Sequence, residues 1–121
     1  MSRSERDKGA RGEREVAELF RAHGFDAERT PNSGGLMIRG DLAGSVPAHL
    51  EVKRQEVLRL PTWMRQAEAD APEGVVPVVC YRQNSGRWYA TLPLADLAAL
   101  IRKSADSQAE WDAVVGGSRG V

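Results

Sequence analysis

Apolar residues recur at helical spacing in three stretches of the chain. In residues 12–23 they fall three or four positions apart, and Gly24 then supplies a residue suited to a helix C-cap. Pro61 suits the first turn of a second helix, which Pro72 ends, and Pro93 opens a third. The three apolar stripes are Val16, Leu19, Phe20 and His23; Leu60, Trp63, Met64, Ala67 and Ala71; and Leu94, Leu97, Ala98 and Ile101.

Five short stretches between turn residues have the composition of β-strands: residues 25–29, 41–43, 48–53, 75–81 and 87–91. The second and third are expected to form a hairpin that turns through residues 44–47. Pro77 calls for an edge position or a bulge in the fourth strand. The order helix, three strands, helix, two strands, helix predicts an α/β or α+β fold with helices covering a sheet.

The length of 121 residues and the ordinary apolar and charged content indicate a single domain, residues 1–121. Residues 1–10 are predicted to be a mobile basic arm, and residues 104–121 a weakly ordered tail. A lone cysteine, Cys80 in the most apolar strand, excludes an intrachain disulfide and a cysteine-based zinc site, and a buried thiol is expected. No apolar run has the length of a membrane span, so we expect a cytoplasmic protein with no membrane partner.

The third predicted strand carries the most informative polar pattern. Because side chains two residues apart share a face, Glu51 and Lys53 point to one side, and Leu50 and Val52 point into a core. His49 lies behind the charged pair, where a structural role is favoured over one at a metal. A carboxylate beside an ammonium on so apolar a strand suggests chemistry. The alternative is a solvated strand face with a cross-strand ion pair.

Asp41 begins the partner strand of the predicted hairpin, so its carboxylate is expected beside that of Glu51. Two close carboxylates raise each other's pKa unless a cation lies between them. Hard oxygen ligands suit Mg²⁺, which retains several waters and takes few carboxylates, and Mn²⁺ is expected to substitute for it. Bound Mg²⁺ lowers the pKa of a water and neutralises charge on a phosphodiester. Lys53 can hold the attacking water or the developing charge.

Glu13 is the carboxylate of the first helix best placed to face the sheet. On a helical wheel it lies near the edge of the buried side, whereas Glu15 and Glu18 point away. Glu13 is therefore expected to look toward the sheet that carries Asp41 and Glu51. A favourable interaction with the positive end of the helix dipole is the alternative role for Glu13.

Four segments, in order and with matching spacing, resemble the archaeal-type Holliday-junction resolvases and their phage relatives, which are PD-(D/E)xK nucleases. Lys8-Gly9 with Glu13-Arg14 resembles their first-helix motif, whose Glu is a metal-site residue, so the resemblance implies Glu13 as a third metal ligand beside Asp41 and Glu51. Arg29 to Gly34 resembles their loop after the first strand. Asp41 with Glu51-Val52-Lys53 resembles their metal-binding hairpin, and Gln66-Ala67-Glu68 a segment of their second helix. One departure is Gly40, which stands where the motif often has proline.

The resemblance implies a restriction-endonuclease-like fold, in which helices flank a central mixed sheet of about five strands. It also implies Mg²⁺-dependent cleavage of DNA by a homodimer. The expected catalytic residues are Glu13, Ser33, Asp41, Glu51, Lys53 and Gln66; Ser33 and Gln66 come from the resemblance alone. Apolar residues outside the catalytic half could line the dimer interface or complete the core: Trp88, Leu92, Leu94, Trp111 and Val115.

The net charge is zero, but basic residues gather near the start and the middle of the chain. The residues expected to bind DNA are Lys8, Arg11, Arg14, Arg29 and Arg54. The predicted substrate is a four-way junction, and the predicted setting is a bacterial host or phage-infected cell. A nicking or restriction-like nuclease is one alternative. The other is a nucleic-acid-binding module without catalysis, against which the intact acidic set argues because uncompensated buried carboxylates are costly.

Overall fold

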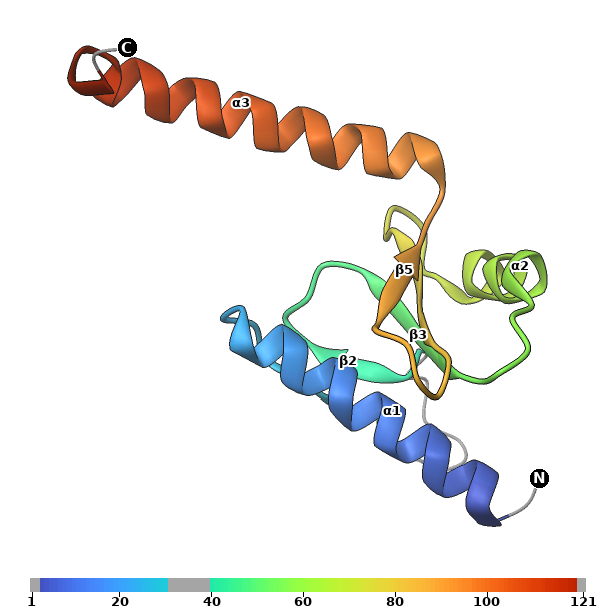
Figure 1. The fold of residues 1–121 in the computed structure, drawn as a ribbon. Coiled ribbons are helices and arrows are strands. Elements are labelled where there is room, and N and C mark those ends of the chain that lie inside the picture. The colour runs from blue at the N-terminus through green and yellow to red at the C-terminus, as the bar shows by residue number, and fades with distance from the viewer. Residues whose placement is uncertain (1–2, 31–39, 120–121) are drawn as a thin grey trace.

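The structure is a computed structural model that describes residues 3–30 and 40–119, and its elements follow the predicted order (Figure 1). In chain order they are α1 (Arg3–Ala22), β1 (Ala27–Arg29), β2 (Leu42–Gly44), β3 (His49–Arg54), α2 (Leu60–Asp70), β4 (Pro77–Arg82), β5 (Tyr89–Thr91) and α3 (Leu94–Arg119). The predicted succession of helices and strands is therefore confirmed. No helix in the described ranges combines the length and the apolar character needed to cross a bilayer.

The strands form two sheets instead of the single central sheet predicted. β1 pairs antiparallel with β2 in a two-stranded sheet, and β3, β4 and β5 form a three-stranded sheet in that order. β3 and β4 run parallel, and β4 and β5 run antiparallel. The fold is thus mixed α/β, with five strands in the described residues divided between two small sheets.

Asp41 lies at the junction between the two sheets. Its backbone N–H donates to the carbonyl of Leu50 at 2.9 Å, and its Oδ2 accepts from the N–H of Val52 at 2.6 Å. The Asp41 carboxylate therefore accepts the hydrogen bond of a backbone N–H at the edge of β3, in place of a carbonyl from a neighbouring strand. The predicted hairpin pairing of residues 41–43 with 48–53 is wrong because a side chain takes the place of the ladder.

The two faces of the β3–β4 pair pack under different helices, as Figure 1 shows. Leu50, Val52 and Cys80 form a buried cluster with Val16 and Ala17 of α1. The opposite face packs under α2, in a second buried cluster of Trp63, Ala67 and Val79. The alternation predicted for β3 is confirmed, because Leu50 and Val52 are buried on one face while Glu51 and Lys53 lie on the other.

Pro77 is not at an edge or a bulge, because β4 is the central strand of its sheet. It is the first residue of β4 and faces His49 across the parallel pair. Pairing with β5 begins only at Val79, so the missing N–H of Pro77 falls before that ladder starts.

Both terminal segments are more regular than predicted. Residues 3–10, predicted as a mobile arm, form the first part of α1, and residues 104–119, predicted as a weakly ordered tail, continue α3. Residues 3–10 contain five charged residues, most of good helix propensity, and residues 104–119 contain three alanines. Figure 1 shows α3 reaching away from the strands and from the other two helices.

Candidate active site

Gly40 sets the position of the Asp41 side chain. Its φ of 85° lies in the left-handed region that favours glycine. A proline there, as the motif often has, would need φ near −65° and could not adopt this backbone. A Cβ at this position would also lie 3.2 Å from the His49 ring and from the Leu50 carbonyl oxygen. The departure from the motif is therefore required by the local path of the chain.

β3 presents Glu51 and Lys53 on the face that packs under α2. Oε1 of Glu51 lies 2.8 Å from Nε2 of His49, whose side chain is buried. The Lys53 ammonium lies 5.9 Å from the centre of the Trp63 ring, within the range of a cation–π interaction. Both functional groups are thus held by neighbours that are themselves in the core.

The carboxyl groups of Asp41 and Glu51 are close enough to form a hydrogen bond with each other. Burial raises the pKa of Asp41 to about 6, and the negative charge of Glu51 adds to the increase. The Val52 N–H acts in the opposite direction. Burial also raises the pKa of Glu51, although the Asp41 hydrogen bond and the Lys53 charge oppose that rise. Both carboxyl groups therefore ionise less readily than usual, and a dication between them would balance the two charges.

Glu13, on α1, is electrostatically coupled to this pair. Burial and the charge of Asp41 raise its pKa, against a 2.9 Å ion pair between its Oε1 and Nε of Arg29. The charge of Glu13 in turn raises the pKa of Glu51. Glu13 thus faces the same region as the two strand carboxylates, as the helical wheel predicted.

Among the described residues, no group of three or more His, Cys, Asp or Glu side chains is arranged to enclose a metal ion. The expected third ligand, Glu13, is therefore not gathered with the other two. The Asp41–Glu51 pair still fits Mg²⁺, because this ion takes one or two carboxylates and completes its shell with water and substrate oxygens. Burial is the main cause of the raised pKa of both carboxyl groups, and the nearby Lys53 charge does not fully offset it.

The structure describes one of the two remaining predicted catalytic residues. Gln66 is exposed on α2, and Ser33 lies outside the described residues. Of the residues expected to bind DNA, Arg11 and Arg14 are exposed on α1, and Lys8 is half-buried there. The guanidinium of Arg29 is held by Glu13.

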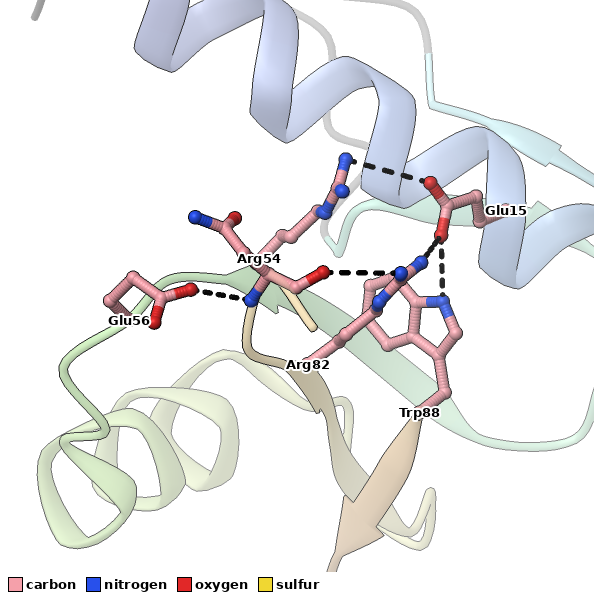
Figure 2. Close-up of polar contacts among 6 residues, drawn as sticks. Glu15, Arg54, Glu56, Arg82 and Trp88 are labelled. Atoms are coloured by element: carbon pink, nitrogen blue, oxygen red, sulfur yellow. Dashed lines mark hydrogen bonds and ion pairs between the residues drawn. The ribbon is translucent and has the colours of Figure 1, made fainter. Parts of the chain in front are cut away.

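The sequence analysis missed one polar cluster on the α1 side of the sheet. Glu15 accepts hydrogen bonds from Nη1 of Arg82 at 2.5 Å and from Nε1 of Trp88 at 3.0 Å (Figure 2). Its other oxygen lies 3.6 Å from Nη1 of Arg54. The interpretation that Glu15 points away from the protein is therefore wrong, and Arg54 is engaged inside the fold.

The clue to this cluster was Gly12, one turn before Val16. A Cβ there would lie 3.3 Å from side-chain atoms of both Arg54 and Trp88. Glycine thus lets α1 approach the ends of β3 and β5 closely, and Glu15 comes within reach of two long arginine side chains. Sequence alone shows neither the parallel register that pairs Arg54 with Arg82 nor the approach of the helix.

A family model described as "Phage putative PDDEXK endonuclease" matches residues 4–115, nearly the whole chain. The chain belongs to this family. The predicted membership of the PD-(D/E)xK superfamily is thereby confirmed, and the family description supports a nuclease. A search of curated proteins found no match.

Proposed function

We propose that this protein is a metal-dependent endonuclease that hydrolyses phosphodiester bonds in DNA, with Asp41, Glu51 and Lys53 at its catalytic centre. The observation that carries the proposal is the close pair of carboxyl groups, both with raised pKa: Glu51 on the face of β3 that also presents Lys53, and Asp41 at the edge of that strand. A pair of acids without adequate countercharge is costly in a fold that serves stability alone. The protein also belongs to an endonuclease family, which supports the same function.

Asp41 and Glu51 would hold Mg²⁺, or Mn²⁺ in its place, and Glu13 would contribute if it turned from Arg29. When bound, the ion supplies charge neutralisation at the phosphate and lowers the pKa of a water. The protein fixes both carboxylates in advance: the Val52 N–H holds Asp41 at 2.6 Å, and His49 holds Glu51 at 2.8 Å. Such supporting contacts orient ligands and tune their basicity.

Lys53 would act on the phosphate. Its ammonium lies on the same face of β3 as Glu51 and can donate to a phosphate oxygen or position the attacking water. Contact with the Trp63 ring restricts the long side chain. Ser33 and Gln66 are expected to assist near the scissile group, as the resemblance implies.

The finer proposal is a Holliday-junction resolvase that acts as a homodimer. A four-way junction has two equivalent strands to cut, and a two-fold pair of subunits matches that symmetry. Lys8, Arg11 and Arg14 occupy the helix that also carries Glu13, so they could contact phosphates beside the site. A nicking or restriction-like nuclease stays the alternative within the enzyme class, and a non-catalytic nucleic-acid-binding module stays the alternative outside it.

The test is cleavage of a labelled four-way junction, with a linear duplex and a single strand beside it, in Mg²⁺ or in EDTA. We expect Mg²⁺-dependent cuts on the junction, and loss of cutting in Asp41→Asn with DNA binding retained or strengthened. Glu18→Gln is the matched control, because Glu18 is an exposed carboxylate of α1. Full activity of Asp41→Asn in Mg²⁺ contradicts the mechanism, and equal cutting of duplex contradicts the junction preference.

Lys53→Ala separates metal binding from turnover. This variant should retain Mg²⁺-dependent thermal stabilisation, because both carboxylates remain, while losing cleavage. Loss of the metal-induced stabilisation in Lys53→Ala would show that Lys53 organises the ion site and not the phosphate.

A further inference from the structure

The face of β3 that carries Lys53 continues across the sheet as a row of aromatic side chains. In the strand register, Lys53 lies beside Tyr81 of β4, and Tyr81 lies beside Tyr89 of β5. Side chains of paired residues project from the same face of a sheet, so both phenol rings lie on the side that presents Lys53. With strands about 4.8 Å apart, the row extends about 10 Å from Lys53 to Tyr89. It therefore leads from the candidate active site to the edge strand of the sheet.

Tyr89 presents a supported aromatic ring to the solvent. Its ring stacks on that of Tyr81, with the ring centroids 5.9 Å apart and an angle of 27° between the planes. Tyr81 in turn packs against the buried cluster that contains Trp63. Tyr89 itself is 55% exposed, so the core supports one side of the ring pair while its outer member stays open.

A shallow hollow of about 190 Å³ opens beside this ring pair. It lies between the connection from β3 to α2 and the turn from β4 to β5, and it is lined by Leu58, Tyr81, Gln83, Gly86, Arg87 and Tyr89. A hydrogen bond joins the two segments, because Nε2 of Gln83 donates to the backbone carbonyl of Glu56 at 2.8 Å. The hollow is therefore fixed by contacts within the protein itself.

Arg87 brings positive charge to the rim of the hollow. It is exposed, and within the described ranges no acceptor engages its guanidinium. Arg82 and Arg54, by contrast, are held by Glu15 on the other face of the sheet. A guanidinium beside an exposed aromatic ring offers a phosphate contact next to a stacking surface, which is the combination that binds single-stranded nucleic acid.

We propose that the Tyr89 ring stacks on an unpaired nucleobase of the strand that is cut at the Asp41–Glu51 pair, while Arg87 contacts a neighbouring phosphate. This inference rests on the proposed function, because it takes DNA as the substrate, and it adds a contact outside the catalytic centre. Every base has a π-face, so the contact does not depend on base sequence.

The contact depends instead on the structure of the DNA. In a continuous duplex, neighbouring bases cover both faces of each base, and exposing one costs unstacking energy. At a branch, a gap or an end, a base face is available without that cost. Tyr89 thus provides a physical reason for preferring interrupted DNA over a continuous duplex.

The length of the aromatic row fits this arrangement. Successive nucleotides of a stacked strand rise by about 3.4 Å, so the distance of about 10 Å from Lys53 to Tyr89 corresponds to about three nucleotides. One strand can therefore place a phosphate at Lys53 and a base on Tyr89, with Arg87 beside the same stretch of backbone.

The first experiment measures base stacking without cleavage. A duplex with a short single-stranded gap carries a fluorescent adenine analogue that loses emission when it stacks, and the protein is titrated in EDTA. We expect quenching by the wild type and by Tyr89→Phe, which keeps the ring. Tyr89→Leu, which keeps an apolar side chain on Tyr81 but has no ring, should quench little. Its dissociation constant for the gapped DNA should rise at least about tenfold.

Two comparisons decide the result of that titration. Trp111→Leu removes an equally exposed ring from α3, which reaches away from the strands (Figure 1), and should quench as the wild type does. Binding of Tyr89→Leu to a continuous duplex should weaken by less than about twofold, since no free base face is present there. Absence of quenching by the wild type, or equal weakening on duplex and gapped DNA, overturns the proposal.

The second experiment tests Arg87 and does not depend on how well Tyr89→Leu folds. The affinity of Arg87→Gln for the gapped DNA is measured over a range of salt concentrations. The slope of log K against log salt should fall by about one, because one phosphate contact is lost. Lys103→Gln, which removes a positive charge from exposed α3, should leave the slope unchanged. An unchanged slope in Arg87→Gln overturns the assigned phosphate contact.

These experiments separate the stacking site from the nuclease assignment. A protein that shows Tyr89-dependent quenching but cuts no DNA in Mg²⁺ contradicts only the catalytic part of the proposed function. A protein that cuts DNA in Mg²⁺ without Tyr89-dependent quenching contradicts only the stacking site.

Discussion

The two faces of the β3–β4 pair handle carboxylates in opposite ways. On the α1 side, Glu15 accepts hydrogen bonds from Arg82 and Trp88 and lies beside Arg54, as Figure 2 shows. By contrast, Glu51 lies on the α2 side and Asp41 at the edge of β3, where the two carboxyl groups interact and burial raises the pKa of both. The protein neutralises the first site with its own cations and leaves the second short of positive charge. The first arrangement suits stability, and the second suits an ion supplied from outside.

The largest expected effect is the loss of cleavage when a carboxylate on the α2 side is neutralised. Glu51→Gln should reduce cleavage by at least about 1000-fold, comparable to removal of a main transition-state group in other enzymes. Glu15→Gln should retain most of the activity, because Glu15 lies on the other face. Initial cleavage rates at saturating Mg²⁺ measure both. Comparable losses in the two variants would mean that the contrast between the faces has no catalytic meaning.

The reverse pattern is expected for stability. Glu15→Gln removes the charge that balances Arg54 and Arg82 and should lower the free energy of unfolding by about 2 kcal/mol. Urea unfolding at neutral pH, followed by circular dichroism, measures this loss. Glu18→Gln, exposed on the same helix, is the control and should change stability little. An unchanged unfolding midpoint in Glu15→Gln contradicts the structural role of the cluster.

Asp41 should give the protein a distinctive pH dependence in the absence of divalent ions. The unfolded chain releases the Asp41 proton near pH 3.8, whereas the folded chain retains it up to about pH 6. This group therefore lowers the free energy of unfolding as pH rises through that window, and the penalty persists above it. Asp41→Asn should remove the penalty and raise stability at pH 8 by on the order of 1–3 kcal/mol. A variant that is equally altered at pH 3.5 and pH 8 would contradict this origin.

The smallest expected effect concerns the Trp88 indole. Trp88→Phe keeps an aromatic ring but removes the N–H that donates to Glu15 at 3.0 Å. The cost should be about 1 kcal/mol in the free energy of unfolding, since two arginines still hold the carboxylate. Thermal unfolding of Trp88→Phe and Glu15→Gln measures this cost. A larger loss of stability in Trp88→Phe than in Glu15→Gln would contradict the prediction that the Glu15 carboxylate matters more than the Trp88 N–H.

The sequence predicted local structure better than it predicted pairing. Periodicity and turn residues gave the element order, and alternation gave the two faces of β3, because both depend on neighbouring residues. The predicted hairpin was wrong because Asp41 uses its side chain where a strand would use its backbone. No local sequence pattern shows whether the Val52 N–H will donate to a side chain or to the backbone of a neighbouring strand.

The candidate site followed the same division. The motif spacing selected Asp41, Glu51 and Lys53, and the wheel selected Glu13; the structure brings Asp41 and Glu51 close together, and Glu13 is coupled to them only electrostatically. Glu15 was missed because it precedes Val16 and so lies about 100° from the centre of the buried side on the wheel. The structure confirms that the buried side is centred near Gly12 and Val16. Only the tertiary approach of the helix shows which flank meets Arg54 and Arg82.

The tight turn where β2 ends also affects how tolerance to substitution should be interpreted. Gly44 has φ of 146°, and a Cβ there would lie 2.0 Å from the carbonyl oxygen of Asp26. Every other amino acid should therefore be rejected at this position, although glycine has no functional group to contribute. In a saturation mutagenesis screen scored by activity, Gly44 should look as essential as Asp41. Soluble protein yield would separate the two, because only Gly44 variants should fail to accumulate.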